Sequence, residues 1–166
     1  MRARRISSRM QGNPIFMEKA IALATENVTS GRGGPFGSVI VRDGSIVATG
    51  ANLVFVNNDP TAHAEVVAIR NACAALASFR LDGCQIYTSC EPCPMCLGAI
   101  HWAHCGAIFY GNSSADAAAA GFDDALLYEE FKRPIHQRRI PTVSLLSEKA
   151  ISSFDAWRAH PGRIDY

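Results

Sequence analysis

His63-Ala64-Glu65 and Pro92-Cys93-Pro94-Met95-Cys96 decide the expected organisation of the chain, because both segments lie at predicted helix starts. They supply one imidazole and two thiols, which are donors that zinc accepts, and one spare carboxylate. Structural zinc sites usually have four protein ligands, whereas catalytic sites have three and keep one position for water. The pattern therefore predicts a water-activating zinc centre, with His63, Cys93 and Cys96 as ligands and Glu65 as proton carrier.

Each half of this pattern has other uses. A Cys-x-x-Cys pair also occurs in redox motifs and in structural zinc sites. A single histidine or glutamate near a helix start is often only a cap or a solvated side chain. Glu65 separates the alternatives, because a purely structural site has no use for it. We do not expect Cys90 to bind the metal, since a fourth thiolate would close the position for water.

Composition indicates a globular chain. The 166 residues are 48% apolar and 19% charged, which suits one domain with a sizeable core. A formal net charge of +1 gives no strong electrostatic case for nucleic acid or membrane binding. No apolar run approaches the roughly 20 residues that span a bilayer. We expect a flexible basic arm over residues 1–12, with an organelle transit peptide as the alternative, and a single domain over residues 13–166.

Cysteine usage points to a reducing compartment. Six cysteines follow no recognisable secretory signal, so they are expected to be thiols in a cytoplasmic protein.

Patterning predicts alternating strands and helices. Asn13 can cap a first helix that begins at Pro14 and ends before Gly31, and Asp43-Gly44 is typical of a hairpin turn. Helices are also expected after residues 59–61, from the second motif to about residue 103, and over 116–120, 126–132 and 154–159. Strands are expected over residues 36–42, 45–50, 85–89, 107–110 and 142–146. This order predicts an α/β fold with a mixed sheet flanked by helices.

The spacing of the first motif sets a geometric condition. Residues two apart lie on nearly opposite sides of a regular helix. His63 and Glu65 can therefore serve one site only if the site lies off the helix end or the first turn is irregular.

Residues 92–100, together with His63-Ala64-Glu65, resemble the cytidine deaminase superfamily of zinc-dependent nucleobase deaminases. Within it the chain is similar to the bacterial guanine deaminases from Pro14 to Tyr166. The zinc motif is shared by many deaminases, so residues 121–124 and the tail are more selective for the substrate. The closer match is carried by residues 33–37, 59–65, 87–91, 120–124, 154–158 and the terminal Tyr166.

This resemblance implies a three-layer α/β/α sandwich around a five-stranded mixed sheet. It also implies a homodimer that exchanges C-terminal segments, so that the tail of one subunit covers the active site of the other. The implied reaction converts the small purine guanine and water to xanthine and ammonia, with one zinc ion per subunit.

The resemblance also implies roles for individual residues. His63, Cys93 and Cys96 would bind zinc, and Glu65 would be the main proton shuttle. In the purine site, Asp124 would lie near the amino group and assist proton transfer. Asn52 and the backbone of Ala64 would hydrogen-bond the base. Phe36 and Trp102 would form walls, and Tyr166 would act from the partner subunit. By residue type alone, Asp124 suits a loop or cap, Asn52 a turn and Tyr166 a frayed terminus.

Two kinds of alternative stay open. The chain could deaminate another base or nucleoside, such as tRNA adenosine, cytosine, guanosine or an aminotriazine, or it could be a non-catalytic zinc-stabilised binding module. An RNA substrate would need a basic surface. A basic cluster comprises Lys132, Arg133, His136, Arg138 and Arg139. We interpret it as a solvated face and expect no nucleic acid partner.

Overall fold

A computed structural model of the chain describes residues 11–165. The predicted basic arm is therefore almost entirely outside the described residues, and Tyr166 is outside them as well. The chain divides into two compact units, one ending at Asp124 and one beginning at Ala125. No helix among the described residues is long and apolar enough to cross a membrane.

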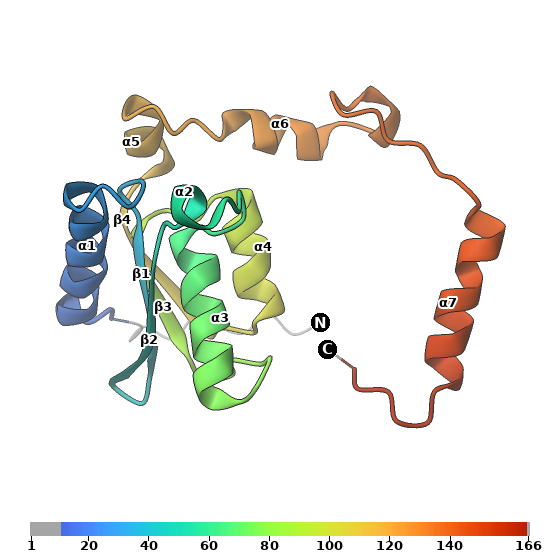
Figure 1. Ribbon diagram of the computed structural model, residues 1–166, viewed down its shortest axis with the longest axis horizontal. Helices are drawn as coiled ribbons and strands as arrows, with labels where there is room; N and C mark the ends of the chain where they lie inside the picture. Colours follow the sequence, from blue (N-terminus) through green and yellow to red (C-terminus); the bar gives the residue numbers. More distant parts are fainter. Residues whose placement is uncertain (1–10, 166) are drawn as a thin grey trace. The chain divides into compact units, whose positions relative to one another are not determined.

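The first unit contains a mixed four-stranded sheet in the order β2-β1-β3-β4 (Figure 1). Strand β1 (Gly37–Arg42) pairs antiparallel with both β2 (Ser45–Ala51) and β3 (Gln85–Cys90), and β3 pairs parallel with β4 (Ala107–Asn112). Asp43 and Gly44 have φ values of 51° and 74°, as a tight hairpin turn requires. The α/β class is therefore confirmed.

The expected fifth strand is wrong. The segment over residues 142–146 has no regular secondary structure, and the sheet has four strands rather than five. Thr142 and Val143 have high strand propensity, but this propensity acts only when a neighbouring strand completes the hydrogen bonds. The second unit, to which the segment belongs, contains helices and no strand among its described residues.

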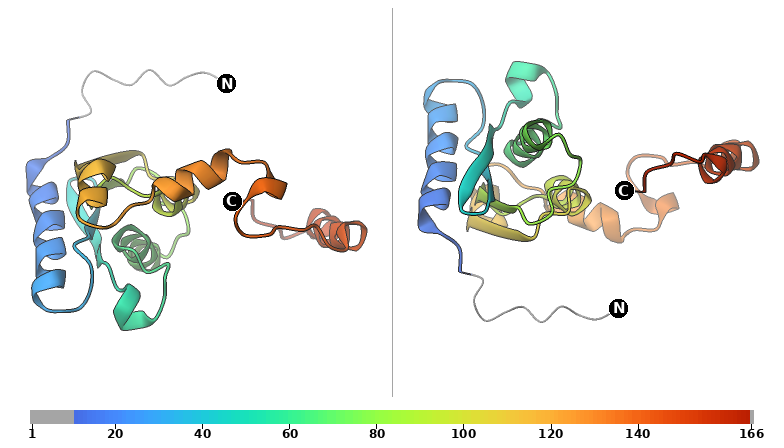
Figure 2. Two further views of the ribbon diagram at one scale, coloured as in Figure 1. Left: turned by 90° about the horizontal axis from the view of Figure 1, so that it is seen from above. Right: turned by 90° about the horizontal axis from the view of Figure 1, so that it is seen from below.

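Helices cover both faces of the sheet (Figures 1 and 2). Helix α1 (Pro14–Thr29) lies on one face, and α3 (Ala64–Leu76) and α4 (Pro94–Trp102) lie on the other. Asn13 caps α1 as expected, since its side chain accepts a hydrogen bond from the backbone N–H of Ile15 at 3.0 Å. Two apolar clusters fill the layers: Ala20, Val39, Val41 and Tyr87 under α1, and Ile40, Ala68, Ile69, Ala72, Leu81, Cys84, Ile86, Ile100 and Ala103 under α3 and α4.

The pairing register gathers several segment ends at one edge of the sheet. Gly37 at the start of β1 lies opposite Ala51 at the end of β2, and Cys90 at the end of β3 lies beside Asn112 at the end of β4. Two short helices follow strand ends near this edge: α2 (Val54–Asn57), which we did not predict, and α5 (Ser114–Ala119). The second motif directly follows the end of β3, and the first motif follows α2 and begins α3, so this edge positions the candidate site.

The second unit has α6 (Ala125–Lys132), a 3₁₀ turn η1 (Ile135–Gln137) and α7 (Ser147–Ala159). Helix α7 begins at Ser147 rather than at the expected Phe154. No described residue of this unit is buried. Its exposed large apolar side chains include Phe131, Ile140, Val143, Leu145 and Phe154.

Candidate active site

Both motifs place their first ligand at a helix N-cap. His63 caps α3 with φ −66° and ψ 156°, and Cys93 caps α4 with φ −63° and ψ 166°. Both residues have extended rather than helical backbone, so their side chains lie at the N-terminal ends of the two helices and not on a helix face. Glu65 is in the first turn of α3. The condition posed by the His-x-Glu spacing is met, because the site lies off the helix ends.

Three side chains form a group that can hold a metal ion. The donor atoms of His63, Cys93 and Cys96 all lie within 4.8 Å of one another, and they are the only such group among residues 11–165. His63 Nδ1 is 3.7 Å from Cys93 Sγ and 3.5 Å from Cys96 Sγ. A nitrogen and a sulfur bound tetrahedrally to zinc lie about 3.5 Å apart, given bonds of about 2.0 and 2.3 Å. The donor set therefore fits zinc with one position left over.

The protonation state of these three side chains at neutral pH favours cation binding. The hydrogen bond from the Cys96 thiol to Cys93 Sγ lowers the pKa of Cys93 to about 4, with a further contribution from His63. The same bond raises the pKa of Cys96, and the contact with Cys93 raises the pKa of His63. One thiolate is thus present at neutral pH. The partial positive charge at the N-terminus of α4 also favours a thiolate.

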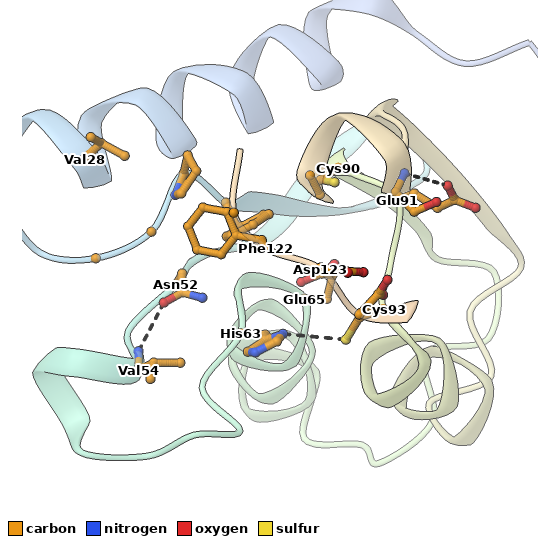
Figure 3. Close-up of a pocket in the computed structure, with 18 of the residues that line it drawn as sticks. Val28, Asn52, Val54, His63, Glu65, Cys90, Glu91, Cys93, Phe122 and Asp123 are labelled. Atoms are coloured by element: carbon orange, nitrogen blue, oxygen red, sulfur yellow. Dashed lines mark hydrogen bonds between the residues drawn. The ribbon is translucent and has the colours of Figure 1, made fainter. Parts of the chain in front are cut away.

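Glu65 is buried beside these donors, with only 5% of its surface exposed (Figure 3). Burial raises the pKa of its carboxyl group, and the negative charge of Cys93 adds to this effect. A carboxyl group with a raised pKa can accept and return a proton near neutral pH. Neither the distances nor the pKa shifts require Glu65 as a metal ligand, so it is free to carry protons.

A cavity of about 610 Å³ opens beside the metal donors. Its walls belong entirely to the first unit, and it brings together most of the residues expected at the site: Phe36, Asn52, His63, Glu65, Cys93 and Asp124. Cys96 is fully buried behind Cys93. Since the zinc donors line one end, a small planar ligand can reach them from this cavity.

Asn52 presents a hydrogen-bond donor to the cavity. Its Oδ1 accepts a hydrogen bond from the backbone N–H of Val54 at 3.3 Å, which assigns the orientation of the amide (Figure 3). The Nδ2 group is therefore the part of the side chain that is left for a ligand. Phe36 adds an apolar wall, and its ring packs edge-to-face on Phe122 at 4.9 Å between ring centroids.

The remaining expected residues are placed differently. Asp124 lines the cavity, and burial, together with the charge on Cys93, raises the pKa of its carboxyl group. Ala64 is fully buried between His63 and Glu65. Trp102 does not line the cavity and is 67% exposed near the C-terminal end of α4. Tyr166 is outside the described residues.

The cavity also has lining residues to which sequence reasoning assigned no individual role, among them Phe122, Glu91 and Cys90. Glu91 Oε2 accepts a hydrogen bond from the backbone N–H of Ser114 at 3.0 Å, which ties the start of α5 to the end of β3. Burial raises the pKa of Cys90 to about 11, so this thiol is protonated at neutral pH. The sequence could have indicated Glu91 and Cys90 as cavity residues, because they lie directly before the second motif.

Comparison with known proteins identifies the family. Residues 10–112 match the family described as the cytidine and deoxycytidylate deaminase zinc-binding region. The chain belongs to this family. Membership confirms the expected zinc cofactor, since the matched region contains both motifs and the His-Cys-Cys group.

Relatives within the family differ in how much of the chain they match. The guanine deaminase of Bacillus subtilis is 52% identical over 91% of this chain and 97% of its own length. Its X-ray structure superposes with a TM-score of 0.91, covering 94% of this chain and 99% of that one. The tRNA-specific adenosine deaminase of the same organism is 35% identical over 84% of each chain. The resemblance to the guanine deaminases is thus confirmed.

Proposed function

We propose that the chain catalyses the zinc-dependent hydrolytic deamination of guanine to xanthine and ammonia. One observation carries this choice of substrate. The family match ends at residue 112, whereas the likeness to the guanine deaminase of Bacillus subtilis extends over 91% of the chain in sequence and 94% in structure. It therefore includes segments beyond the zinc region, such as Phe122 and Asp124, which line the cavity.

The proposed chemistry divides between the metal donors and Glu65. His63, Cys93 and Cys96 would hold the ion, and a bound zinc ion lowers the pKa of water from about 15.7 to about 7. Glu65 would take the proton of the attacking water as the C–O bond forms at the carbon that bears the amino group. It would then return protons to the ring nitrogen and the leaving nitrogen as the C–N bond breaks and ammonia departs.

The proposed base site uses the walls of the cavity. Asn52 Nδ2 would donate a hydrogen bond to an acceptor of the purine, and the Ala64 backbone N–H would donate another from the first turn of α3, where N–H groups lack helical partners. Phe36 would contact the flat face of the base. Asp124 would face the amino group and assist proton transfer, for which its raised pKa is suitable. Trp102 remains a predicted wall residue, outside the cavity of the first unit.

We further propose that the active form is a homodimer that exchanges its C-terminal segments and places Tyr166 over the partner's site, with residues 13–166 acting as one domain. The observation that supports exchange is the second unit itself, which buries no described residue and exposes large apolar side chains. Such a segment gains little stability until another surface covers it.

Deleting the last six residues tests this covering role. The truncated protein should keep its zinc but turn over guanine more slowly, because water is then excluded less well from the site. Size-exclusion chromatography with light scattering reports the dimer, and unchanged guanine kinetics in the truncated protein would reject the covering role.

The predicted cytoplasmic location and the expectation of no nucleic acid partner are consistent with this small-molecule activity.

An ammonia-release screen tests the proposed function. The zinc-loaded protein is assayed against guanine, guanosine, adenine, cytosine, cytidine, an aminotriazine and a tRNA anticodon stem-loop. We expect guanine to give the highest kcat/KM. A preference for another substrate would replace guanine, and no turnover of any substrate would favour a non-catalytic zinc module.

A further inference from the structure

Asn27 is a fully buried polar residue in the last part of α1, and no step of the proposed reaction uses it. Its Nδ2 donates hydrogen bonds to two backbone carbonyls, Gly34 O at 2.9 Å and Asn52 O at 2.8 Å. These carbonyls belong to two segments that are separate in the sequence, and Gly34 and Asn52 both line the cavity. One side-chain amide therefore joins both segments.

The chemistry of the contact requires two donors at this position. Turning the amide over would place Oδ1 against two carbonyl oxygens, so the orientation is assigned by the partners. In the observed orientation Oδ1 has no hydrogen-bond partner among the described residues. The amide nitrogen is thus the part of Asn27 that the structure uses.

The loop after α1 is also tied to the backbone of Asn27. Asn27 O accepts hydrogen bonds from the N–H groups of Arg32 at 3.0 Å and Gly33 at 3.3 Å. A Cβ atom on Gly33 would overlap Asn52 O and lie 2.9 Å from Asn27 Nδ2. The loop can approach this closely only because residue 33 has no side chain.

Two residues of the proposed base site depend on these segments. Asn52 carries the donor that would bind the purine, and its own N–H is bonded to Phe36 O at 3.1 Å. The N–H of Phe36 is bonded to Gly34 O at 2.8 Å, the same carbonyl that accepts from Asn27. The bridge therefore acts together with the direct bond between Asn52 and Phe36 in fixing these two residues relative to each other.

We propose that Asn27 is a positioning residue that sets the spacing between the hydrogen-bonding and apolar walls of the base site. The inference rests on the proposed function, because it assigns the effect of Asn27 to purine binding. The metal donors and Glu65 are held by α3 and α4, to which the Asn27 amide makes no hydrogen bond. Loss of the bridge should therefore raise KM for guanine and leave zinc binding intact.

Asn27→Asp is the sharpest probe, because it keeps the size of the side chain and replaces both donors with acceptors. Asn27→Ala is the milder variant and decides the question if Asn27→Asp does not fold. Asn71→Asp and Asn71→Ala are matched controls, since Asn71 Nδ2 also donates to a carbonyl, Thr49 O at 2.9 Å, but is exposed and outside the cavity.

Two measurements decide the result. Steady-state kinetics should show KM for guanine raised at least fivefold by the Asn27 variants, with kcat within twofold and zinc content unchanged. Hydrogen exchange should be faster in the peptides that contain residues 33–37 and 51–54 and unchanged in α3 and α4. The Asn71 variants should match the parent in both measurements.

An unchanged KM in the folded Asn27 variants would overturn the proposal, as would a loss of zinc or faster exchange throughout the first unit. If the parent protein does not turn over guanine, the proposed function fails on that result alone. The exchange pattern then still decides whether Asn27 holds the two walls, since it needs no substrate. In that case, hydrogen exchange that is unchanged in the Asn27 variants, or faster throughout the first unit, would reject the positioning role as well.

Discussion

Glu65→Gln separates proton transfer from metal binding. Glutamine has nearly the same shape as glutamate but cannot accept and return a proton at neutral pH. Glu65 is 5% exposed, so bulk water has little access to take over its role. General acid–base catalysis typically contributes about 10²- to 10⁴-fold in rate, and we take the middle of this range as the expected loss. We expect kcat for guanine to fall about 10³-fold, which corresponds to about 4 kcal/mol of barrier.

The assay measures ammonia release from guanine together with bound zinc in the same protein sample. Zinc content should stay at the parent level, because the three donors His63, Cys93 and Cys96 are unchanged. KM should change little, since Glu65 acts in the reaction more than in holding the base. Glu18→Gln is a suitable control, because Glu18 is an exposed carboxylate of α1 outside the catalytic cavity.

Turnover within tenfold of the parent by a zinc-loaded Glu65→Gln protein would refute the reasoning. It would mean that another group moves the protons, and Asp124 would be the first to test, because its carboxyl group lines the same cavity and has a raised pKa. A variant that loses zinc would refute the reasoning differently, since Glu65 would then belong to the metal site.

Three further predictions concern the base, the fold and the metal. Asn52→Ala should raise KM for guanine about tenfold with zinc retained, because one hydrogen bond to the base is lost; an unchanged KM would remove Asn52 from the base site. The hydrogen bonds that Ser113 donates hold the pKa of Asp116 below its usual value, so their stabilisation is present above about pH 4 and is lost as pH falls through the lowered pKa. Asp116→Asn should therefore lower stability at pH 7 and bring it closer to the parent's at pH 2, as urea unfolding at each pH would report; a difference that does not vary with pH would contradict this. Removing the metal with a chelator should abolish turnover and lower the thermal midpoint, added zinc should restore both, and turnover by protein verified to be metal-free would contradict the proposed chemistry.

The features that sequence predicted well depend on near neighbours in the chain. Asn13 caps the helix that follows it, and Asp43-Gly44 adopts the positive φ values of a tight turn. His63 and Cys93 start helices because the residues after them have a regular apolar pattern, and this places the donors at the helix ends. Each of these predictions needs only a few consecutive residues.

The features that sequence missed depend on distant segments. A strand was expected over residues 142–146 from their side chains, but strand formation needs a partner strand that the second unit does not supply among its described residues. Trp102 lies at the opposite end of α4 from Cys93, and its role as a wall of the pocket stays a prediction. Asn27 gave no signal, because its burial arises only when residues 30–37 fold back over α1.

The metal donors with Glu65 and the proposed base walls are therefore held by different kinds of contact, and the two parts should differ in how well they tolerate substitutions. The metal donors and Glu65 lie at the N-termini of α3 and α4, where helix geometry and dipoles fix thiolate and carboxylate positions with few other contacts. The proposed base walls lie on loops that are joined by a few hydrogen bonds, such as those from Asn27 to Gly34 and Asn52. Substitutions in these loops can alter which base is held without disturbing the zinc donors.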